Sequence, residues 1–512
     1  MTHAGETRLL PADTNQARGL ADYAIDFLLR DPRPVGAATW ALLQRFHLDS
    51  VGCGVSALAA GANAPAVLRR EALATPPMTG SCGGICFGSR RPCLVERAVA
   101  ANAAAVREWD SNGTNFGHDA ATGRTAGEFG HNDYYPVAVA AAGEAGLDGD
   151  ATLRLMLLID EIRGRLAEVF ALRKYAIDHV HHGAVAAAVA YATALGGTVD
   201  QIESAIGMVV AHYVPYRAIR AGHQLSDSKG ASAALSSEVA VMAARRALAG
   251  FVGPRDVFRN PLAIYRRNEP CPADRSPFDL ELGVAGDAFA IHGMHFKLGL
   301  YEHQSAGALQ SLVDLFAAHP ALAGDIDGIR RIAVRIYEPA FSIIADPAKR
   351  TPTTRQSADH SLPFILARTL LKARVASGSG RPVGWESLML LPDDYAAEAI
   401  RDPAVARLIA AMTIEHGGPE YDALYPEGIP TSVTIEHATL GRMGGDVVTF
   451  PLGHARADAA RTAAVVDLKF ERLVANAVAS PADLRARMAV AGASPSEVAE
   501  LYAFPIHGCD PG

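Results

Sequence analysis

The sequence has few cysteines and few aromatic residues for its length. Six of its 512 residues are cysteine, and Phe, Trp and Tyr together make up 7%. Six scattered thiols cannot stabilise a chain of this size through disulfides, so we expect them to be reduced. The segment SCGGICFGSRRPC at 81–93 has neither C-x-x-C spacing nor a nearby histidine. It therefore predicts a glycine-rich strand pair and no metal site.

The sequence also lacks an excess of positive charge, a long apolar run and a secretory signal. Lys and Arg number 47 against 55 Asp and Glu, a net charge of -8, which argues against a nucleic-acid partner. The longest apolar runs, such as 184–195, are shorter than the ~20 residues that a spanning helix needs, so we expect no membrane partner. The N-terminal residues have no basic region leading into an apolar one. We therefore expect a cytoplasmic protein.

What is abundant is helical periodicity, which continues from the start of the chain to about residue 255. Hydrophobic residues make up 49% of the chain, and its length favours two domains. Thr198 and Gln201 form a capping-box pattern before an apolar helix, and Pro136 suits the first turn of another. The high alanine content predicts helices that approach one another closely. The first part of the chain is therefore predicted to be a large helical domain.

The pattern changes after about residue 290. Ile332, Val334 and Ile336 alternate with other residues as in a strand, and 431–450 predicts a hairpin around Gly444 and Gly445. The segments 361–377 and 403–416 have helical patterns, and helix returns from Ser480. We predict a mainly α fold, a large all-helical domain with a smaller α/β lid domain. The helical domain comprises 1–290 and 460–512, and the lid comprises 291–459.

Four polar clusters stand out against this apolar background. They are EWDSNGT with the later EFGHNDYYP, then DHVHHG, AIRAGHQLSDSKG and HFKLGLYEHQ. Taken singly, each has an ordinary structural explanation: His179 as a helix cap, Lys229 as an exposed cation, His303 as a surface residue. The three histidines of DHVHHG are compatible with a metal site, an acid/base site or a polar helix start. Their spacing alone does not decide between these.

Taken together and in order, the clusters resemble the MmgE/PrpD family, which includes 2-methylcitrate dehydratase, cis-aconitate decarboxylase and iminodisuccinate epimerase. EWDSNGT is similar to the family's Asp-x-x-x-Thr segment at Asp110 and Thr114, and LSDSKG to its Leu-Ser-x-x-Lys-Gly motif at Lys229. IDHVHHG resembles a dehydratase segment that singles out His179 from His181 and His182.

Three further segments carry the same resemblance. GHNDYYP looks like the family's His-Pro-Ser-Asp stretch at His131, and FKLGLYEHQ like the segment that opens the small domain, at Lys297 and His303. TRQSADHSLPF, which holds His360, is similar to a long stretch of the dehydratases. The resemblance implies a helical domain with an α/β lid, a homodimer, and no metal or other cofactor.

The sequence departs from the family pattern at two places. Gly113 stands where many relatives carry Asp, and Asn132 to Tyr135 replace Pro-Ser-Asp after an insertion. These departures leave the identity of the substrate open.

The residue types suit chemistry on a polycarboxylate. Removal of a proton next to a carboxylate builds negative charge, so a site needs cations and hydrogen-bond donors, and histidine serves as acid or base near neutral pH. We expect Lys229 to act on this charge and to contribute little to core packing. The predicted catalytic residues are His131, His179, Lys229 and His303. The predicted substrate-binding residues are Asp110, Thr114, Arg220, Lys297 and His360.

The leading hypothesis is a metal-free hydro-lyase that acts on a small tricarboxylate such as 2-methylcitrate, in propionate catabolism. A decarboxylase or isomerase of an aconitate-like acid is the nearest alternative. An alternative of another class is a carboxylate-binding protein without catalysis. For Asp110 and Thr114, capping of a helix is an equally good explanation.

Overall fold

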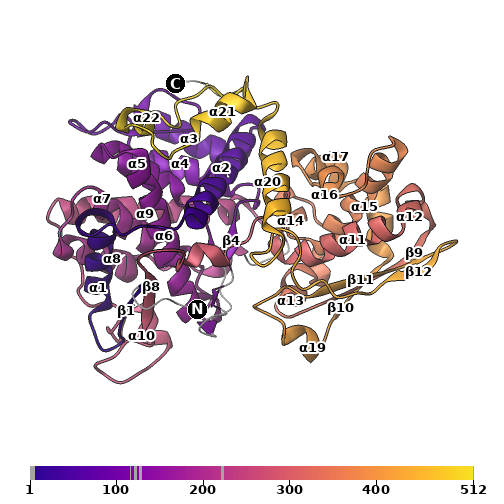
Figure 1. Cartoon of the computed structure of the whole chain (residues 1–512), viewed down its shortest axis with the longest axis horizontal. Helices are drawn as coiled ribbons and strands as arrows, with labels where there is room; N and C mark the ends of the chain where they lie inside the picture. Colours follow the sequence, from indigo (N-terminus) through magenta and orange to yellow (C-terminus); the bar gives the residue numbers. More distant parts are fainter. Residues whose placement is uncertain (1–5, 116, 120–123, 126–129, 221–223, 511–512) are drawn as a thin grey trace.

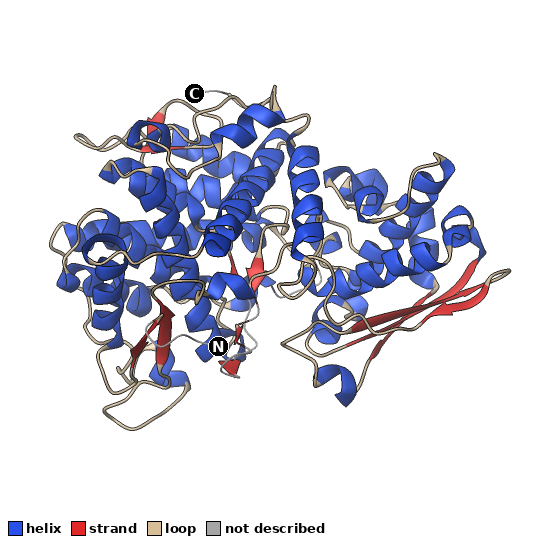
Figure 2. Ribbon diagram, in the orientation of Figure 1, coloured by secondary structure: helices blue, strands red, loops and turns tan. Residues whose placement is uncertain are grey.

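The computed structural model describes residues 6–115, 117–119, 124–125, 130–220 and 224–510. Helices take up 55% of the residues and strands 10%, so the predicted mainly α fold is confirmed. A large helical part and a smaller part that carries a four-stranded sheet lie side by side (Figure 1). Figure 2 shows that the longest strands are confined to the small part.

The helical part is built around α7 (Val180–Ala194), in which all 15 residues are buried. Its neighbours are α5 (Tyr135–Ala145), α6 (Gly149–Val169), α8 (Val199–His212) and α9 (Asp227–Leu248). Small side chains permit this packing. A Cβ atom at Gly183 would lie 2.1 Å from Cζ of Tyr134, so only glycine fits where this ring crosses α7.

Further helices of this part precede α5 or come soon after α9. They are α1 (Gln16–Ile25), α2 (Ala37–Ala59), α3 (Asn63–Leu73), α4 (Val95–Arg107) and α10 (Ile264–Asn268). Short antiparallel strand pairs connect them: β1 (Thr7–Leu10) with β8 (Leu280–Gly283), β2 (Gly84–Ile85) with β3 (Pro92–Cys93), and β4 (Thr114–Asn115) with β7 (Gly130–His131).

Local sequence signals account for several of these boundaries. Thr198 and Gln201 form the predicted capping box of α8, and Pro136 lies in the first turn of α5. The β2–β3 pair falls within the glycine-rich segment at 81–93, as predicted.

The small part contains a sheet with strand order β10-β9-β11-β12. The strands are β9 (Ile329–Ile336), β10 (Met412–His416), β11 (Thr431–His437) and β12 (Gly441–Gly444). Helices α11 (Ala306–Ala318) and α15 (Leu362–Gly378) lie over one face (Figure 1), and α18 (Pro403–Ala410) packs on α15. Ile332, Val334 and Ile336 are buried beneath these helices, which confirms the predicted alternation.

Short helices join these elements. They are α12 (Pro320–Gly324), α13 (Ala340–Ile344), α14 (Arg355–Ala358), α16 (Trp385–Leu388), α17 (Ala397–Ile400) and α19 (Pro419–Asp422). Of these, α13 and α14 lie on the side of the small part that reaches the helical part.

Two sequence-based expectations in the small part are wrong in detail. The helix predicted over 403–416 ends at Ala410, and 412–416 forms β10, because these residues pair in parallel with β9. The hairpin of β11 and β12 turns at 438–440 and not at Gly444 and Gly445. Both glycines have positive φ, 82° and 112°, so they turn the chain out of the sheet after β12.

After the small part the chain returns to the helical part through α20 (Ala459–Val474), α21 (Pro481–Arg487) and α22 (Pro495–Ala499) (Figure 1). Helix α20 packs on α2, where Lys469 and Asp49 form a fully buried ion pair at 2.7 Å. The Lys469 ammonium also donates to the carbonyls of Ser111, at 2.6 Å, and Lys297, at 2.8 Å. The returning helix therefore fixes two segments that carry predicted site residues.

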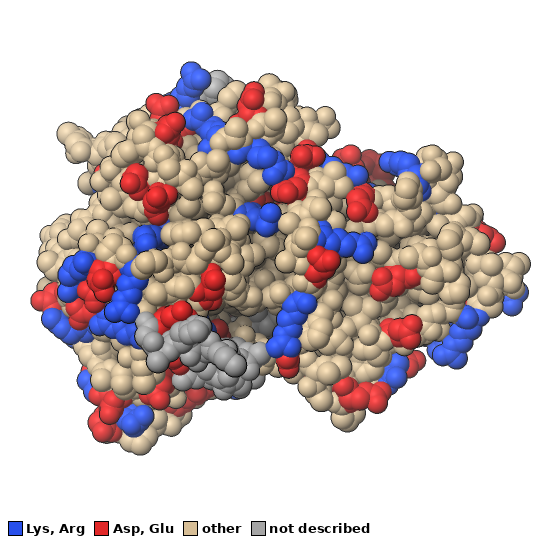
Figure 3. Space-filling view, viewed as in Figure 1, with Lys and Arg blue, Asp and Glu red and all other residues tan. Residues whose placement is uncertain are grey.

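The surface shown in Figure 3 has acidic and basic side chains interspersed, in keeping with the modest net charge. Within the described ranges, no single helix has both the length and the apolar character needed to cross a membrane. Helices α2 and α3 meet that test only as a pair, bent by 89°.

Candidate active site

A cavity of about 340 Å³ lies where the helical part meets the small part. Seven of the nine residues predicted to act on a substrate line it: Asp110, Thr114, His131, His179, Lys229, His303 and His360. The fold thus gathers side chains that are up to 250 residues apart in the sequence. The other two are Lys297, which lies behind Asp110, and Arg220, whose side chain falls outside the described part of the structure.

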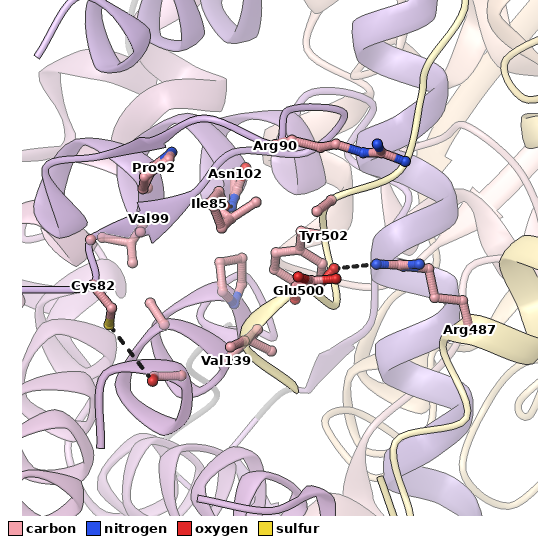
Figure 4. Close-up of a pocket in the computed structure, with 18 residues that line it drawn as sticks. Cys82, Ile85, Arg90, Pro92, Val99, Asn102, Val139, Arg487, Glu500 and Tyr502 are labelled. Carbon is pink, nitrogen blue, oxygen red and sulfur yellow. Dashed lines mark hydrogen bonds between the residues drawn. The ribbon is translucent and has the colours of Figure 1, made fainter. Parts of the chain in front are cut away.

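A larger cavity of about 460 Å³ lies elsewhere in the helical part (Figure 4). Val99, Val139 and Tyr502 form part of its wall, and Arg90 and Arg487 lie at one side. Its described lining residues include neither histidine nor lysine. The smaller cavity therefore holds the residues suited to acid/base chemistry on an anion.

Asp110 is the centre of a buried network of charges beside the cavity. Its backbone has φ 49°, a left-handed conformation that is unusual for a residue other than glycine, and only 1% of the residue is exposed. The carboxylate pairs with the Arg107 guanidinium, and it lies 2.6 Å from Nζ of Lys297 and 3.3 Å from Nζ of Lys229. Burial alone would raise the pKa of Asp110, but these three cations hold it well below its usual range.

Neither Asp110 nor Thr114 caps a helix through its side chain. The Thr114 hydroxyl donates to the carbonyl of Gly130, at 3.1 Å, across the β4–β7 pair. The same pair places Thr114 directly opposite His131. The capping explanation for these two residues is therefore wrong, and both contribute instead to the wall of the cavity.

Lys229 lies in the first turn of α9, where only 1% of it is exposed. Its ammonium is 3.3 Å from Asp110 and 3.3 Å from Asp359, which belongs to the small part. The expectation that Lys229 contributes little to core packing is wrong, because it is buried between two carboxylates. It joins the two parts of the molecule at the cavity.

His131 and His179 face each other with ring centroids 5.0 Å apart. His131 ends β7, and His179 directly precedes α7, with no side-chain hydrogen bond that caps the helix. Burial, reinforced by the charges of Arg107 and Lys297, lowers the pKa of His131 well below its usual value. A neutral imidazole therefore lines the cavity, with a nitrogen able to accept a proton.

The other two histidines of the DHVHHG segment turn away from the cavity. His181 Nδ1 contacts the carbonyl of Tyr213 at 2.9 Å, and the His182 ring stacks on Tyr265. Both are fully buried in the helical core. Within the described ranges, no cluster of three His, Cys, Asp or Glu residues is arranged to hold a metal ion.

The small part contributes His303 and His360 to the cavity. His303 begins a 3₁₀ turn, His303–Ser305, and its Nε2 lies 3.0 Å from Nδ1 of His295. His360 lies between two carboxylates, with Nε2 at 3.1 Å from Asp110 and Nδ1 at 2.6 Å from Asp359. His360 therefore links the two carboxylates that also bind Lys229.

Further charged and polar residues, which the sequence did not predict, line the same cavity: Arg107, Arg217, Glu302, Gln304, Asp346 and Lys349. Arg107 is 2% exposed and ends the alanine-rich helix α4, so its position three residues before Asp110 was the available signal. Burial and the nearby Asp110 charge raise the pKa of Glu302 to about 7. Glu302 is therefore a second group suited to proton transfer near neutral pH.

The departures from the family pattern have structural explanations. Asp133 lies 3.7 Å from Nε of Arg107, which lines the cavity, and accepts a hydrogen bond from Asn112 at 2.5 Å. At Gly113, a Cβ atom would lie 2.5 Å from Cε1 of Phe46. The ring of Phe46 therefore leaves no room at position 113 for the aspartate that many relatives carry.

Comparisons with known proteins agree with this arrangement. The model of the MmgE/PrpD N-terminal domain matches residues 18–268, and that of the MmgE/PrpD C-terminal domain matches residues 303–382. The chain belongs to the MmgE/PrpD family. The two matched segments supply the two sides of the cavity.

Relatives across most of the chain are named 2-methylcitrate dehydratase. The protein from Salmonella typhimurium (strain LT2) is 23% identical over 458 residues, covering 88% of each chain. The one from Salmonella typhi is 24% identical over 444 residues, and the one from Escherichia coli (strain K12) is 23% identical over 446, each covering 85% of both chains. These matches support dehydratase chemistry at the level of the family.

Proposed function

We propose that this protein is a hydro-lyase that removes water from a small tricarboxylate, with 2-methylcitrate as the first candidate. The observation that supports this most strongly is the combination of neutral imidazoles and buried cations around one cavity. Its volume of about 340 Å³ lies within the ~300–1,000 Å³ typical of small-ligand sites.

The cations of the cavity suit a substrate with several carboxylates. Among the described residues, four cations line the cavity: Lys349 from the small part, and Arg107, Arg217 and Lys229 from the helical part. Negative charge that develops when a proton leaves the carbon next to a carboxylate is stabilised by such preorganised cations. Asp110 and Asp359 hold Lys229 in place, so it need not reorganise during the reaction.

Proton removal is assigned to the His131 and His179 pair. A neutral imidazole of lowered pKa has a lone pair available at neutral pH, and a positioned base supplies ~10²- to 10⁴-fold in rate. The departing hydroxyl needs a proton from a second group. His303 and Glu302 line the small-part side of the cavity and are the candidates for this acid.

The proposal includes metal independence, because lysine and arginine side chains supply the positive charge that the reaction requires. Dialysis against a chelator should leave the activity unchanged. Loss of activity that a divalent ion restores would contradict this part of the proposal.

The test of function is incubation of the purified protein with 2-methylcitrate, citrate, isocitrate and cis-aconitate, with products identified by mass and chromatography. Loss of one water from a hydroxylated tricarboxylate is the expected result. Loss of CO₂ from cis-aconitate would identify a decarboxylase, and a product of unchanged mass an isomerase. Binding without any product would identify a carboxylate-binding protein.

A further inference from the structure

His295 lies directly behind His303 and does not line the cavity itself. Its backbone is held by two hydrogen bonds with Thr114: its N–H donates to the Thr114 carbonyl at 2.7 Å, and its carbonyl accepts from Thr114 N–H at 3.1 Å. On its other side the ring of His454 packs edge-on, with centroids 4.0 Å apart. The His295 ring is thus fixed from two directions, and 4% of the residue is exposed.

The side-chain contact runs between Nδ1 of His295 and Nε2 of His303, 3.0 Å apart. Such a hydrogen bond contains one proton, which belongs to one ring or the other. If His295 donates, a neutral His303 carries its own proton on Nδ1. If His295 accepts, His303 carries its proton on Nε2, and its Nδ1 is a base. His295 therefore controls which of the two roles His303 has.

The surroundings favour neutral rings in this contact. Burial lowers the pKa of both histidines well below the usual value. The positive charge of Lys297 lowers that of His303 further. When both rings are neutral and one N–H joins them, each ring has a defined tautomer. His295 can then determine which nitrogen of His303 carries the proton.

We propose that His295 is a positioning residue that orients the His303 ring and fixes its tautomer for proton transfer in the cavity. The consequence for catalysis rests on the proposed function, whereas the consequence for the chemistry of His303 does not. The Thr114 contacts involve only the backbone of residue 295. Substitutions of the His295 side chain can therefore test the hydrogen bond while the strand contact stays in place.

The test uses three matched variants. His295→Asn places an amide where Nδ1 was, because both atoms are bonded to Cγ. His295→Gln places its amide at the more distant Nε2 position, and His295→Leu has no polar atom. If His295 positions His303, His295→Asn should retain kcat within about 3-fold, while His295→Gln and His295→Leu should lose at least ~10-fold in kcat, with little change in KM. If His295 served only to pack against its neighbours, His295→Leu should instead keep the highest kcat of the three variants.

A second readout does not depend on turnover. Diethyl pyrocarbonate modifies neutral imidazole nitrogens, and peptide mass mapping gives the rate at His303. This rate should be the same in wild type and His295→Asn and should change at least ~3-fold in His295→Leu and His295→Gln. If wild type converts none of the acids, the proposed function fails, but this readout still tests His295. Equal kcat and equal His303 reactivity in all three variants would overturn the inference.

Discussion

The ammonium of Lys229 lies 3.3 Å from the carboxylate of Asp359, in an ion pair that joins the helical part to the small part beside the cavity. The same ammonium lies 3.3 Å from Asp110, and all three side chains are 1–2% exposed. Removal of the lysine would leave two buried carboxylates with one cation fewer. Because such groups are costly to desolvate, Lys229 contributes to stability as well as to the site.

We therefore expect Lys229→Met to have no measurable activity. The substitution should also lower the free energy of unfolding by about 3 kcal/mol. The double variant Lys229→Met with Asp359→Asn should recover part of this stability, because one uncompensated charge is removed, but it should recover no activity. Urea unfolding and turnover measured on the same samples check this. Unchanged stability in Lys229→Met would contradict the ion-pair assignment.

The facing rings of His131 and His179 give a second prediction. His131→Asn and His179→Asn should each reduce kcat by ~10²- to 10⁴-fold, the contribution of a positioned acid or base. The matched control is His212→Asn, at an exposed position near the end of α8. Full activity in either cavity variant would remove that histidine from the mechanism.

Much of the helical part follows from local sequence signals. The capping box at Thr198 and the proline at 136 mark helix starts that the structure contains, because their side chains act on the adjacent turn alone. The segment 412–416 could not be assigned in this way. Its five residues are compatible with helix or strand, and pairing with β9, about 80 residues earlier, decides the outcome.

Some residues of the site can likewise be recognised from their sequence neighbours, whereas others depend on tertiary contacts. The polar clusters identified His131, His179 and Lys229 because these interrupt an apolar background. Arg107 and Glu302 were missed, since their importance comes from what surrounds them: Arg107 from its pairing with Asp110, and Glu302 from burial beside that same charge. The three-residue spacing of Arg107 and Asp110 is visible in the sequence, but the burial of this pair and of Glu302 depends on distant segments.

The buried histidines predict loss of stability in mild acid. Burial lowers the pKa of His47, His181 and His454 to about 4, whereas an unfolded histidine titrates near ~6.5. Between these values the unfolded state binds more protons, so the free energy of unfolding falls as pH falls, by about 2 kcal/mol per histidine at about pH 5. Carboxyls of raised pKa act in the opposite direction: Glu302, Asp49, Glu108, Asp133, Asp160 and Glu238. Six more histidines of lowered pKa add to the loss of stability in acid: His131, His182, His292, His295, His303 and His360.

The measurement is the melting temperature between about pH 8 and pH 5. It should be highest near neutral pH and should fall steeply below about pH 6.5. His47→Gln, which removes one buried imidazole beside Tyr502, should make this fall shallower. A melting temperature that is constant over this range would show that the histidines are not buried in their neutral form.

Substrate preference is predicted to depend on the few apolar side chains of the cavity. Among the residues that the structure describes, Ile343 on α13 and Leu225 are the aliphatic ones that line it. A methyl group against such a surface is worth ~10- to 200-fold in kcat/KM. Ile343→Ser should reduce the preference for 2-methylcitrate over citrate by about 10-fold, measured as the ratio of kcat/KM values. An unchanged ratio would show that the methyl group of 2-methylcitrate does not contact Ile343.

Glu302 provides the prediction that tests acid/base roles most directly. Its pKa is raised to about 7, first by burial and then by the charge of Asp110, so its carboxyl changes protonation within the working range of pH. His303, next to it in sequence, has a lowered pKa and stays neutral over the same range. A titration near pH 7 in the profile of kcat therefore belongs to Glu302. Glu302→Gln keeps the shape of the side chain and its contact with the Gln304 N–H, but it cannot titrate.

In Glu302→Gln, kcat should fall by ~10²-fold or more if the carboxyl transfers a proton, and the remaining activity should show no titration near pH 7. Glu398→Gln, at an exposed position in α17, is the matched control and should keep the wild-type profile. If Glu302→Gln retains both the rate and the titration, the group that titrates near pH 7 is another residue, and Glu302 does not protonate the departing hydroxyl.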